Sequence, residues 1–410
     1  LKQKHLVTVI RRLPIFGRKL NKYFVIALLS IATGCAQIDP GKRLSDGLVF
    51  LGTEMESLPG WNNDKVLNAL PALQKSCSLL LKKLYLKNRS QEALKRYSGW
   101  QKSCDQVTVN SFNENTFREF LKRNFNAYKI RYLGSDEGLF TGYYEPTLYG
   151  SLKPSREYKT PIYPKPTDLI YVNLGEWKRS LGNSRILGRV VGHRLKPYFS
   201  RSDISKGALE GKISPLLWLK SEIDAFFLHI QGSGRVVLPD GEVYRLGYAG
   251  KNGRKYYPIG QYLVEIGAIP KENISMQSIK KWLKENPGKK KDVMNMNPSY
   301  VFFRKLKGKE GPIGAEGVVL TSGRSLAVDR HYSKLGAPIW LSANFGDEEG
   351  KKLQRLMVAQ DTGGAIKGPI RGDVFWGSGK TAERLAGIMK AKGSMYVFYP
   401  KSINPNFISR

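Results

Sequence analysis

The chain has 410 residues, of which 41% are hydrophobic and 25% are charged. These fractions are typical of globular proteins and exclude collagen, coiled coils and wholesale disorder. Lys and Arg outnumber Asp and Glu by 67 to 34, which gives a formal charge of +33 and favours a polyanionic neighbour such as nucleic acid, an anionic membrane or a carboxylate-rich polymer. The length allows two or three domains.

The first residues are typical of a targeting segment. Residues 1–23 carry seven Lys or Arg and no acid, and the uncharged apolar run that follows, 24–33, is too short to span a bilayer but suits the core of a signal peptide. The order of basic region, apolar run and IATGC resembles a bacterial lipoprotein signal, although Leu is more usual than Ala32. We therefore expect a signal segment over 1–34 and lipidation of Cys35, with ordinary cleavage or an uncleaved anchor as the alternative.

Two further cysteines, Cys77 and Cys104, follow the targeting segment. In an exported chain such a pair is more often bridged than free, so we expect a disulfide, with two unpaired buried thiols as the alternative. His193, His229 and His331 are widely scattered, which argues against a zinc site.

The hydrophobic pattern changes near residue 132. Between residues 57 and 125 apolar residues recur at spacings of three and four, which predicts helices. Short β-rich runs broken by Gly and Pro follow, among them the run 224–248 with a hairpin turn at 239–241, and this pattern is typical of barrels or sandwiches.

One helix is expected to interrupt these strands at residues 275–285, where Ser275 can cap it. The next segment, GKKKD at 288–292, is expected to be a solvated loop and is a candidate domain boundary. Short strands then resume with GVVL at 317–320, followed by a helix over 381–392 and a last strand at 395–400.

The sequence GSGKT at 377–381 resembles the end of a phosphate-binding P-loop. The pattern requires a further glycine at the position of Val374, without which the backbone cannot wrap a phosphate. The templates G-x-S-x-G and HExxH are absent from the sequence. Nucleotide binding and the common nucleophile motifs are therefore disfavoured.

The most unusual stretch is 360–379, which contains six glycines and two acids, Asp361 and Asp373. A third acid, Asp329, lies upstream. Asp373 stands between the Gly-rich loop and the apolar run 374–376, where removal from water would raise its pKa toward the value that a general acid needs. By residue type alone, a turn or ion-pair role is the default for such an aspartate.

Five motifs together resemble a known family. They are GYYEP (142–146), DAFFLHIQGSGRV (224–236), NPSYVFF (297–303), GRSLAVDR (323–330) and the stretch 360–379. In this order they resemble the membrane-bound lytic murein transglycosylase A family, over most of the chain from about residue 76 to residue 399. The basic N-terminal extension and the segment 169–198 depart from the family pattern.

The resemblance implies a mainly β fold with N-terminal helices. A double-psi β-barrel domain would comprise residues 35–146 and 304–400, an inserted second β-barrel domain would comprise 147–303, and 401–410 would be a tail. Peptidoglycan glycan strands would bind in a groove between the domains, and the carboxylates of the stem peptides would account for the basic charge.

The resemblance implies no cofactor, no metal and no nucleic-acid partner. It implies a membrane association through the lipid anchor. With Ala36 after the lipidated cysteine, we expect the outer membrane, facing the periplasm. Cell-wall synthesis proteins are candidate partners.

The implied reaction is cleavage of the N-acetylmuramyl-β-1,4-N-acetylglucosamine bond with formation of a 1,6-anhydromuramyl end. Because the 6-hydroxyl of the sugar itself attacks, one carboxyl can serve as acid and then as base. The resemblance assigns this role to Asp373. A non-catalytic, expansin-like glycan-binding module and a basic nucleotide- or nucleic-acid-binding protein are the alternative functions.

The other site residues follow from the same resemblance or from their chemistry. Asp329 and Asp361 are candidate supporting residues, with structural turn acids as the alternative. The candidate sugar platforms are Tyr143, Tyr144 and Trp376, the candidate hydrogen-bonding partners are Gln231 and Ser233, and Lys367 is a candidate contact for a carboxylate. Core packing, turn chemistry and solvation, respectively, are the alternatives for these three groups.

Overall fold

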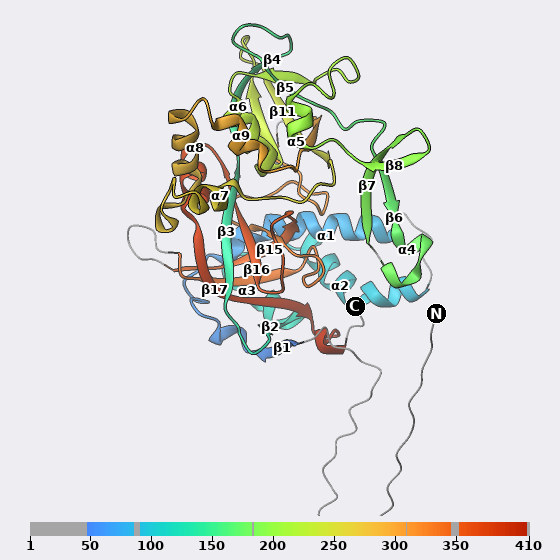
Figure 1. Cartoon of the computed structure of the whole chain (residues 1–410). Coiled ribbons are helices and arrows are strands. Elements are labelled where there is room, and N and C mark those ends of the chain that lie inside the picture. The colour runs from blue at the N-terminus through green and yellow to red at the C-terminus, as the bar shows by residue number, and fades with distance from the viewer. Residues whose placement is uncertain (1–46, 86–90, 183, 309, 346–351, 408–410) are drawn as a thin grey trace, which may run out of the picture. The chain divides into compact units, whose positions relative to one another are not determined.

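A closed β-barrel forms the larger part of the fold in the computed structural model, which describes residues 47–85, 91–182, 184–308, 310–345 and 352–407 (Figure 1). Its strands are β3 (Gly138–Glu145), β13 (Ser325–Val328), β14 (Pro338–Ala343), β15 (Leu353–Asp361), β16 (Arg371–Ser378) and β17 (Lys390–Pro400). The hydrogen-bonded order β17-β14-β15-β13-β16-β3 closes because β3 also pairs with β17. The β13–β15 and β16–β3 pairs are parallel, and the others are antiparallel.

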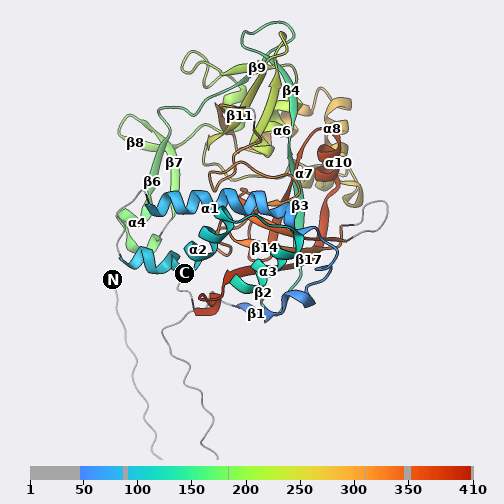
Figure 2. The same ribbon diagram turned by 180° about the vertical axis from the view of Figure 1, so that it is seen from behind.

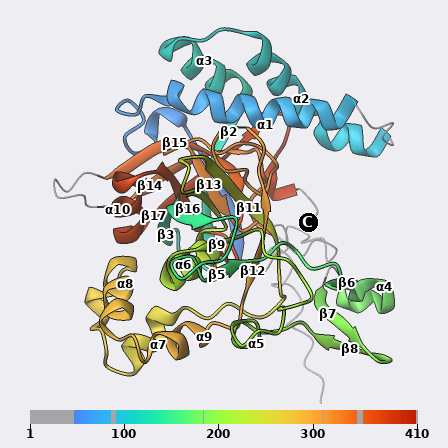
Figure 3. The same ribbon diagram turned by 90° about the horizontal axis from the view of Figure 1, so that it is seen from above.

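A β-ribbon and three helices extend this barrel. The strands β1 (Leu48–Thr53) and β2 (Phe125–Tyr132) continue the sheet from the C-terminal half of β17. The helices α1 (Leu70–Tyr85), α2 (Gln91–Val109) and α3 (Glu114–Asn124) lie along one side of the barrel (Figure 3). Helix α1 buries Leu73, Cys77 and Leu84 at near-helical spacing, so one face of the helix belongs to the core.

A second closed set of strands is formed by the middle of the chain (Figure 2). Its members are β4 (Thr147–Ser151), β5 (Thr160–Ile162), β9 (Leu217–Leu219), β10 (Ser233–Val237), β11 (Val243–Lys251) and β12 (Val301–Lys305). The order is β12-β11-β10-β4-β9-β5, and a bridge between Pro164 and Phe303 joins the chain after β5 back to β12. A separate apolar core that includes Leu148, Val236 and Leu246 fills it. The expected fold class, mainly β with N-terminal helices and two barrels, is confirmed.

The remaining elements decorate the two barrels. They are a small sheet of β6 (Ile170–Asn173), β7 (Arg185–Val191) and β8 (Arg194–Pro197), and the helices α4 (Leu174–Trp177), α5 (Arg201–Ser205), α6 (Glu222–Gln231), α7 (Ile259–Glu265), α8 (Met276–Glu285), α9 (Lys290–Asn295) and α10 (Lys380–Ile388). Ser275 caps α8 in a capping box, as the sequence predicted. Within the described residues, no helix has the length and apolarity required to cross a membrane.

Four sequence-based expectations about elements were wrong. Residues 222–231 form helix α6 instead of a strand. Ser221 caps the start of the helix, and Gly232, at φ 78°, ends it. Because α6 lies between two apolar cores, its apolar residues are spread around the helix and do not show the helical period. The expected loop GKKKD contains the start of α9. The segment GVVL contributes one isolated bridge. The helix expected over 381–392 is α10, which ends at Ile388, because β17 begins already at Lys390.

A disulfide between Cys77 and Cys104 joins α1 to α2, and both residues are buried in the core of the larger barrel. It closes a loop with a sequence separation of 27 residues. Of the two options that the sequence left open, the structure contains the bridged pair.

We expect the double variant Cys77→Ala/Cys104→Ala to lose roughly 3–4 kcal/mol of unfolding free energy, because the cross-link limits the entropy of the unfolded chain. Urea denaturation of the oxidised protein, the reduced protein and the double variant measures this. The reduced protein is the matched control, since it keeps both sulfur atoms in the core. Two free thiols in the unreduced, denatured protein would contradict the bridge.

Candidate active site

The candidate site is built on the parallel pairing of β3 with β16. In this register Asp373 lies opposite Thr141, and Phe375 lies opposite Tyr143. Side chains two residues apart in a strand share a face, so these four side chains lie on one face of the pair. The rings of Tyr143 and Phe375 are 5.3 Å apart.

Asp373 is half-buried and keeps one oxygen free of protein hydrogen bonds. Its Oδ1 accepts a hydrogen bond from the Thr141 hydroxyl at 2.6 Å, and that hydroxyl in turn accepts one from Arg371 at 2.9 Å. Among the described residues, no side chain or backbone group donates to Oδ2. Burial raises the pKa of Asp373 to about 6, against the Thr141 hydrogen bond and Arg371, and the neighbouring charge of Asp361 adds to the rise.

Asp361, at the end of β15, has both oxygens engaged. Its Oδ2 accepts from the Tyr143 hydroxyl at 2.8 Å, and its Oδ1 accepts from the backbone N–H groups of Ala315 and Thr362, each at 2.8 Å. Burial raises its pKa above the usual range although all three hydrogen bonds oppose the rise. The carboxyl therefore holds Tyr143 and the segment at Ala315 in place.

Asp329, which follows β13, anchors the Gly-rich loop. Its Oδ2 accepts from the backbone of Gly368 at 3.0 Å, and its Oδ1 contacts the ring Nδ1 of His331 at 2.8 Å. Burial alone would raise the pKa of this carboxyl, but the hydrogen bonds from Gly368 and His331, with a contribution from Lys367, lower it. Asp329 is thus a charged acceptor that fixes the loop next to β16.

Tyr144 and Trp376 lie on the other face of the β3–β16 pair. Tyr144 is only 3% exposed, and its hydroxyl donates to Glu383 at 2.9 Å. Both side chains belong to a cluster with Ala382 and Ala386 of α10. Of the two roles considered for Tyr144, this placement fits core packing and not a sugar platform. Trp376 is half-buried on the same face.

Three further predicted site residues lie around this centre. Gln231, at the end of α6, accepts a hydrogen bond from the Tyr144 backbone N–H at 3.1 Å and so ties the inserted barrel to β3. Ser233 is buried at the start of β10. Lys367 is exposed in the Gly-rich loop, and its charge lowers the pKa of Asp329 and adds to the lowering that burial produces at Lys251.

Sequence reasoning missed Thr141, Arg371 and Tyr256. Thr141 precedes Tyr143 by two residues, and Arg371 precedes Asp373 by two, so strand alternation could have placed each on the face of its partner. Tyr256 comes from the inserted barrel domain. Burial raises its pKa, Arg201 lowers it and Asp373 raises it, so Tyr256 is within electrostatic range of the Asp373 carboxyl. No signal in the sequence marked it.

In the part of the chain that the structure describes, no group of three or more His, Cys, Asp or Glu side chains is placed to hold a metal ion. Cys35, the predicted lipidation site, lies outside the described residues.

Two family profiles match the chain. One is described as the MltA specific insert domain and matches residues 139–304, and the other is the 3D domain and matches 324–399. The membrane-bound lytic murein transglycosylase A of Escherichia coli K12 is 33% identical over 301 residues, which cover 69% of this chain and 74% of the relative. The chain belongs to the membrane-bound lytic murein transglycosylase A family.

Solved structures of this family share the fold. MltA from Neisseria gonorrhoeae matches with a TM-score of 0.72 and 34% identity over 88% of this chain and 94% of that chain. The enzyme from Agrobacterium tumefaciens matches with a TM-score of 0.76 and 32% identity over 86% and 98% of the two chains. A structure of E. coli MltA with bound chitohexaose matches with a TM-score of 0.62 and 27% identity over 88% and 98%.

The raised pKa of Asp373 makes the free energy of unfolding depend on pH. A carboxyl whose pKa is higher in the folded state binds protons more tightly there, so its contribution to stability is present below the unfolded pKa and is lost as the pH rises through about 6. We expect Asp373→Asn to exceed the wild type in unfolding free energy by about 1–3 kcal/mol at pH 8. The difference should vanish near pH 4.

Urea titrations at pH 4, 6 and 8 measure this difference. Asp240→Asn, in the exposed β10–β11 turn, is the control, because the Asn side-chain oxygen can accept the same hydrogen bond from the Glu242 N–H. An Asp373→Asn variant less stable than the wild type at pH 8 would contradict the account.

Proposed function

We propose that this chain is a lytic transglycosylase that cleaves the N-acetylmuramyl-β-1,4-N-acetylglucosamine bond of peptidoglycan and leaves a 1,6-anhydromuramyl end. In this proposal Asp373 is the single acid and base. The observation that carries it is the contrast between Asp373, with a raised pKa and a free Oδ2, and the two other aspartates, whose oxygens are already engaged.

The engaged oxygens of Asp361 argue against a two-carboxylate glycosidase. Such enzymes need a second carboxylate as a nucleophile or as a base toward water. Asp361 is close enough to raise the pKa of Asp373, but to attack it would have to give up hydrogen bonds from Tyr143 and two backbone N–H groups. A reaction that requires one free carboxyl fits this arrangement better.

The mechanism follows from the pKa and the free oxygen. Protonated Asp373 would donate from Oδ2 to the glycosidic oxygen as the bond to the anomeric carbon breaks. The resulting carboxylate would then take the proton of the sugar 6-hydroxyl as that hydroxyl attacks the anomeric carbon. A pKa of about 6 suits both steps near neutral pH, and the Thr141 hydrogen bond would steady Oδ1 throughout.

The inserted barrel would supply the facing wall of the substrate site. Tyr256 is within electrostatic range of Asp373, and the backbone of Tyr144 is tied to Gln231 of the insert. The E. coli relative has been crystallised with chitohexaose, a chain of β-1,4-linked N-acetylglucosamine. We infer that glycan strands bind between the barrels here, and that the surplus of basic residues attracts the stem-peptide carboxylates.

We expect Asp373→Asn to keep its fold and to lose turnover by about three orders of magnitude or more, because the carboxamide cannot donate and reclaim a proton. Asp361→Asn and Asp329→Asn should lose less, since they act by holding Tyr143 and the Gly-rich loop. The measurement is mass analysis of soluble fragments released from purified sacculi.

Asp240→Asn, remote in the exposed hairpin turn, serves as the matched control and should release fragments at the wild-type rate. Substantial turnover by a folded Asp373→Asn variant would overturn the assignment. Binding of wild-type protein to sacculi without any soluble fragment would favour a non-catalytic glycan-binding module instead.

We also propose that Cys35 carries the lipid anchor and that the protein faces the periplasm from the outer membrane. Two or more acyl chains hold a protein stably on a bilayer. Cys35→Ala should therefore move the full-length protein from the membrane fraction to the soluble fraction, as followed by fractionation and immunoblotting. Retention of the variant in membranes would refute the anchor at this residue.

A further inference from the structure

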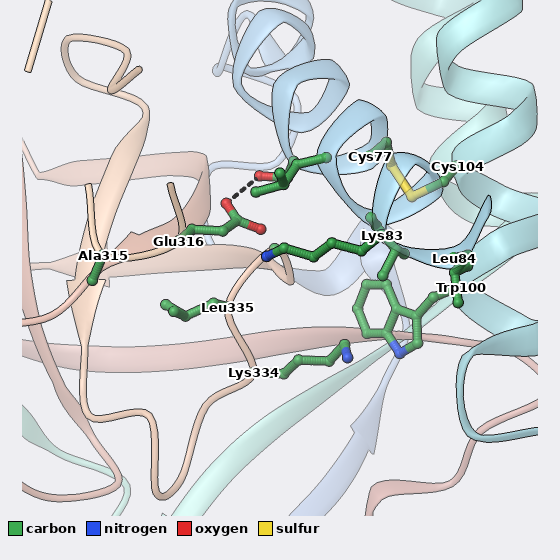
Figure 4. Close-up of a pocket in the computed structure, with 13 residues that line it drawn as sticks. Cys77, Lys83, Leu84, Trp100, Cys104, Ala315, Glu316, Lys334 and Leu335 are labelled. Atoms are coloured by element: carbon green, nitrogen blue, oxygen red, sulfur yellow. Dashed lines mark hydrogen bonds between the residues drawn. A yellow bond between two sulfur atoms is a disulfide. The ribbon is translucent and has the colours of Figure 1, made fainter. Parts of the chain in front are cut away.

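A cavity of about 210 Å³ lies between α1, α2 and the loops that precede β13 and β14 (Figure 4). Of its lining residues, only Ala315 also contacts the candidate active site, through the hydrogen bond from its N–H to Asp361. Its apolar wall comprises Leu79, Leu80, Leu84, Trp100 and Leu335. The volume is below the ~300–1,000 Å³ of drug-sized sites and above that of a single water, so it suits one or two amino-acid residues.

Glu316 places a carboxyl in this cavity. Its Oε2 accepts a hydrogen bond from the Ser76 hydroxyl at 2.6 Å, and its Oε1 accepts none from the residues that the structure describes. Burial raises the pKa of Glu316 to about 7, against the Ser76 hydrogen bond and the charges of Lys83 and Lys334. The half-buried carboxyl is therefore partly removed from water, and one of its oxygens is not used by the described residues.

The space next to the free oxygen is kept open by Gly336. This residue has φ 87°, and a Cβ atom built on it would come within 2.7 Å of Glu316 Oε1. The positive φ favours glycine here, and a Cβ atom would push the Glu316 carboxyl out of its present position. A side chain here would fill the part of the cavity that faces the carboxyl.

Two ammonium groups complete the lining. Figure 4 shows Lys83 reaching along the cavity toward Glu316, and Lys334 on its lower side. The Lys334 ammonium is 5.4 Å from the centre of the Trp100 ring. The Glu316 carboxyl, the Lys83 ammonium group and the apolar wall are complementary to a zwitterion with a short hydrocarbon body.

We propose that this cavity binds the outer end of the diamino-acid residue of a peptidoglycan stem peptide, with its ammonium group at Glu316 and its carboxylate at Lys83. The choice of a stem peptide rests on the proposed function. The zwitterionic chemistry rests on the cavity alone.

The cavity is connected to the candidate active site through adjacent backbone. The Glu316 N–H donates to the carbonyl of Gln360 at 3.0 Å, and the neighbouring Ala315 N–H donates to the Asp361 carboxylate at 2.8 Å. The Ser76 hydroxyl that bonds Glu316 also accepts from the Gln360 side chain at 2.9 Å. A peptide bound at Glu316 thus contacts the segment that fixes Asp361.

The test is calorimetric binding of two tripeptides that lack any glycosidic bond. The first is N-acetyl-Ala-γ-Glu-diaminopimelate, and the matched probe carries Lys in place of diaminopimelate, so it lacks the outer carboxylate. We expect the first probe to bind, and the Lys probe to bind about 10- to 100-fold more weakly. The variants Glu316→Gln and Lys83→Met should weaken binding of the first probe by a similar factor. The control variant Glu272→Gln, at an exposed position, should leave this binding unchanged.

Binding should also release protons near pH 7, because an ammonium group beside Glu316 favours its charged form; Ser76, Lys83 and Lys334 are the other polar groups that face it. Equal binding of both tripeptides, no binding of either, or unchanged binding by Glu316→Gln and Lys83→Met would each overturn the proposal. Because neither probe can be cleaved, binding by Asp373→Asn would uphold the cavity even if the lytic activity failed.

Discussion

The parallel pairing of β3 with β16 is the constraint on which the site depends. It brings Thr141 against Asp373 across 232 residues of sequence. The barrel closes because β3 also pairs with β17. The chain leaves the barrel after β3 and re-enters it at β13, so the segment between these strands is an insertion. The segment between can be large because the entropy of closing a loop grows slowly with its length, and because the inserted barrel has a core of its own.

Three aspartates on one scaffold acquire different properties from their surroundings. Asp329 accepts hydrogen bonds from two backbone N–H groups and contacts a histidine ring, and its pKa is lowered. Asp361 and Asp373 are both buried enough for their pKa values to rise, but Asp361 has three hydrogen bonds and Asp373 has one. Burial raises the proton affinity, and the number of donors decides whether an oxygen remains for a substrate.

The sequence predicted those features of the fold and site that depend only on neighbouring residues in the chain. The Gly-rich stretch 360–379 with its aspartates, the cap at Ser275 and the turn at Gly241 are all readable without tertiary contacts. Helix α6 was mistaken for a strand because burial on all sides removed its periodicity. Tyr143 and Tyr144 were grouped as sugar platforms, although consecutive residues of a strand must face opposite ways.

Other features had no local signal. Tyr256 comes within electrostatic range of Asp373 only because of where the inserted barrel is placed. Glu316 is a single acid with glycines nearby in the sequence, and its significance depends on a cavity formed with the distant helices α1 and α2. Such residues become visible only when the chain is folded, because burial and not sequence context sets their chemistry.

The central claim is that the sugar's own 6-hydroxyl, deprotonated by Asp373, displaces the leaving group. The most direct measurement is digestion of purified sacculi in water enriched in heavy oxygen, followed by mass analysis of the primary products. The account predicts 1,6-anhydromuramyl ends that contain no solvent oxygen and are one water lighter than hydrolysis products. Reducing ends that carry heavy oxygen as primary products would contradict it, because solvent would then be the nucleophile.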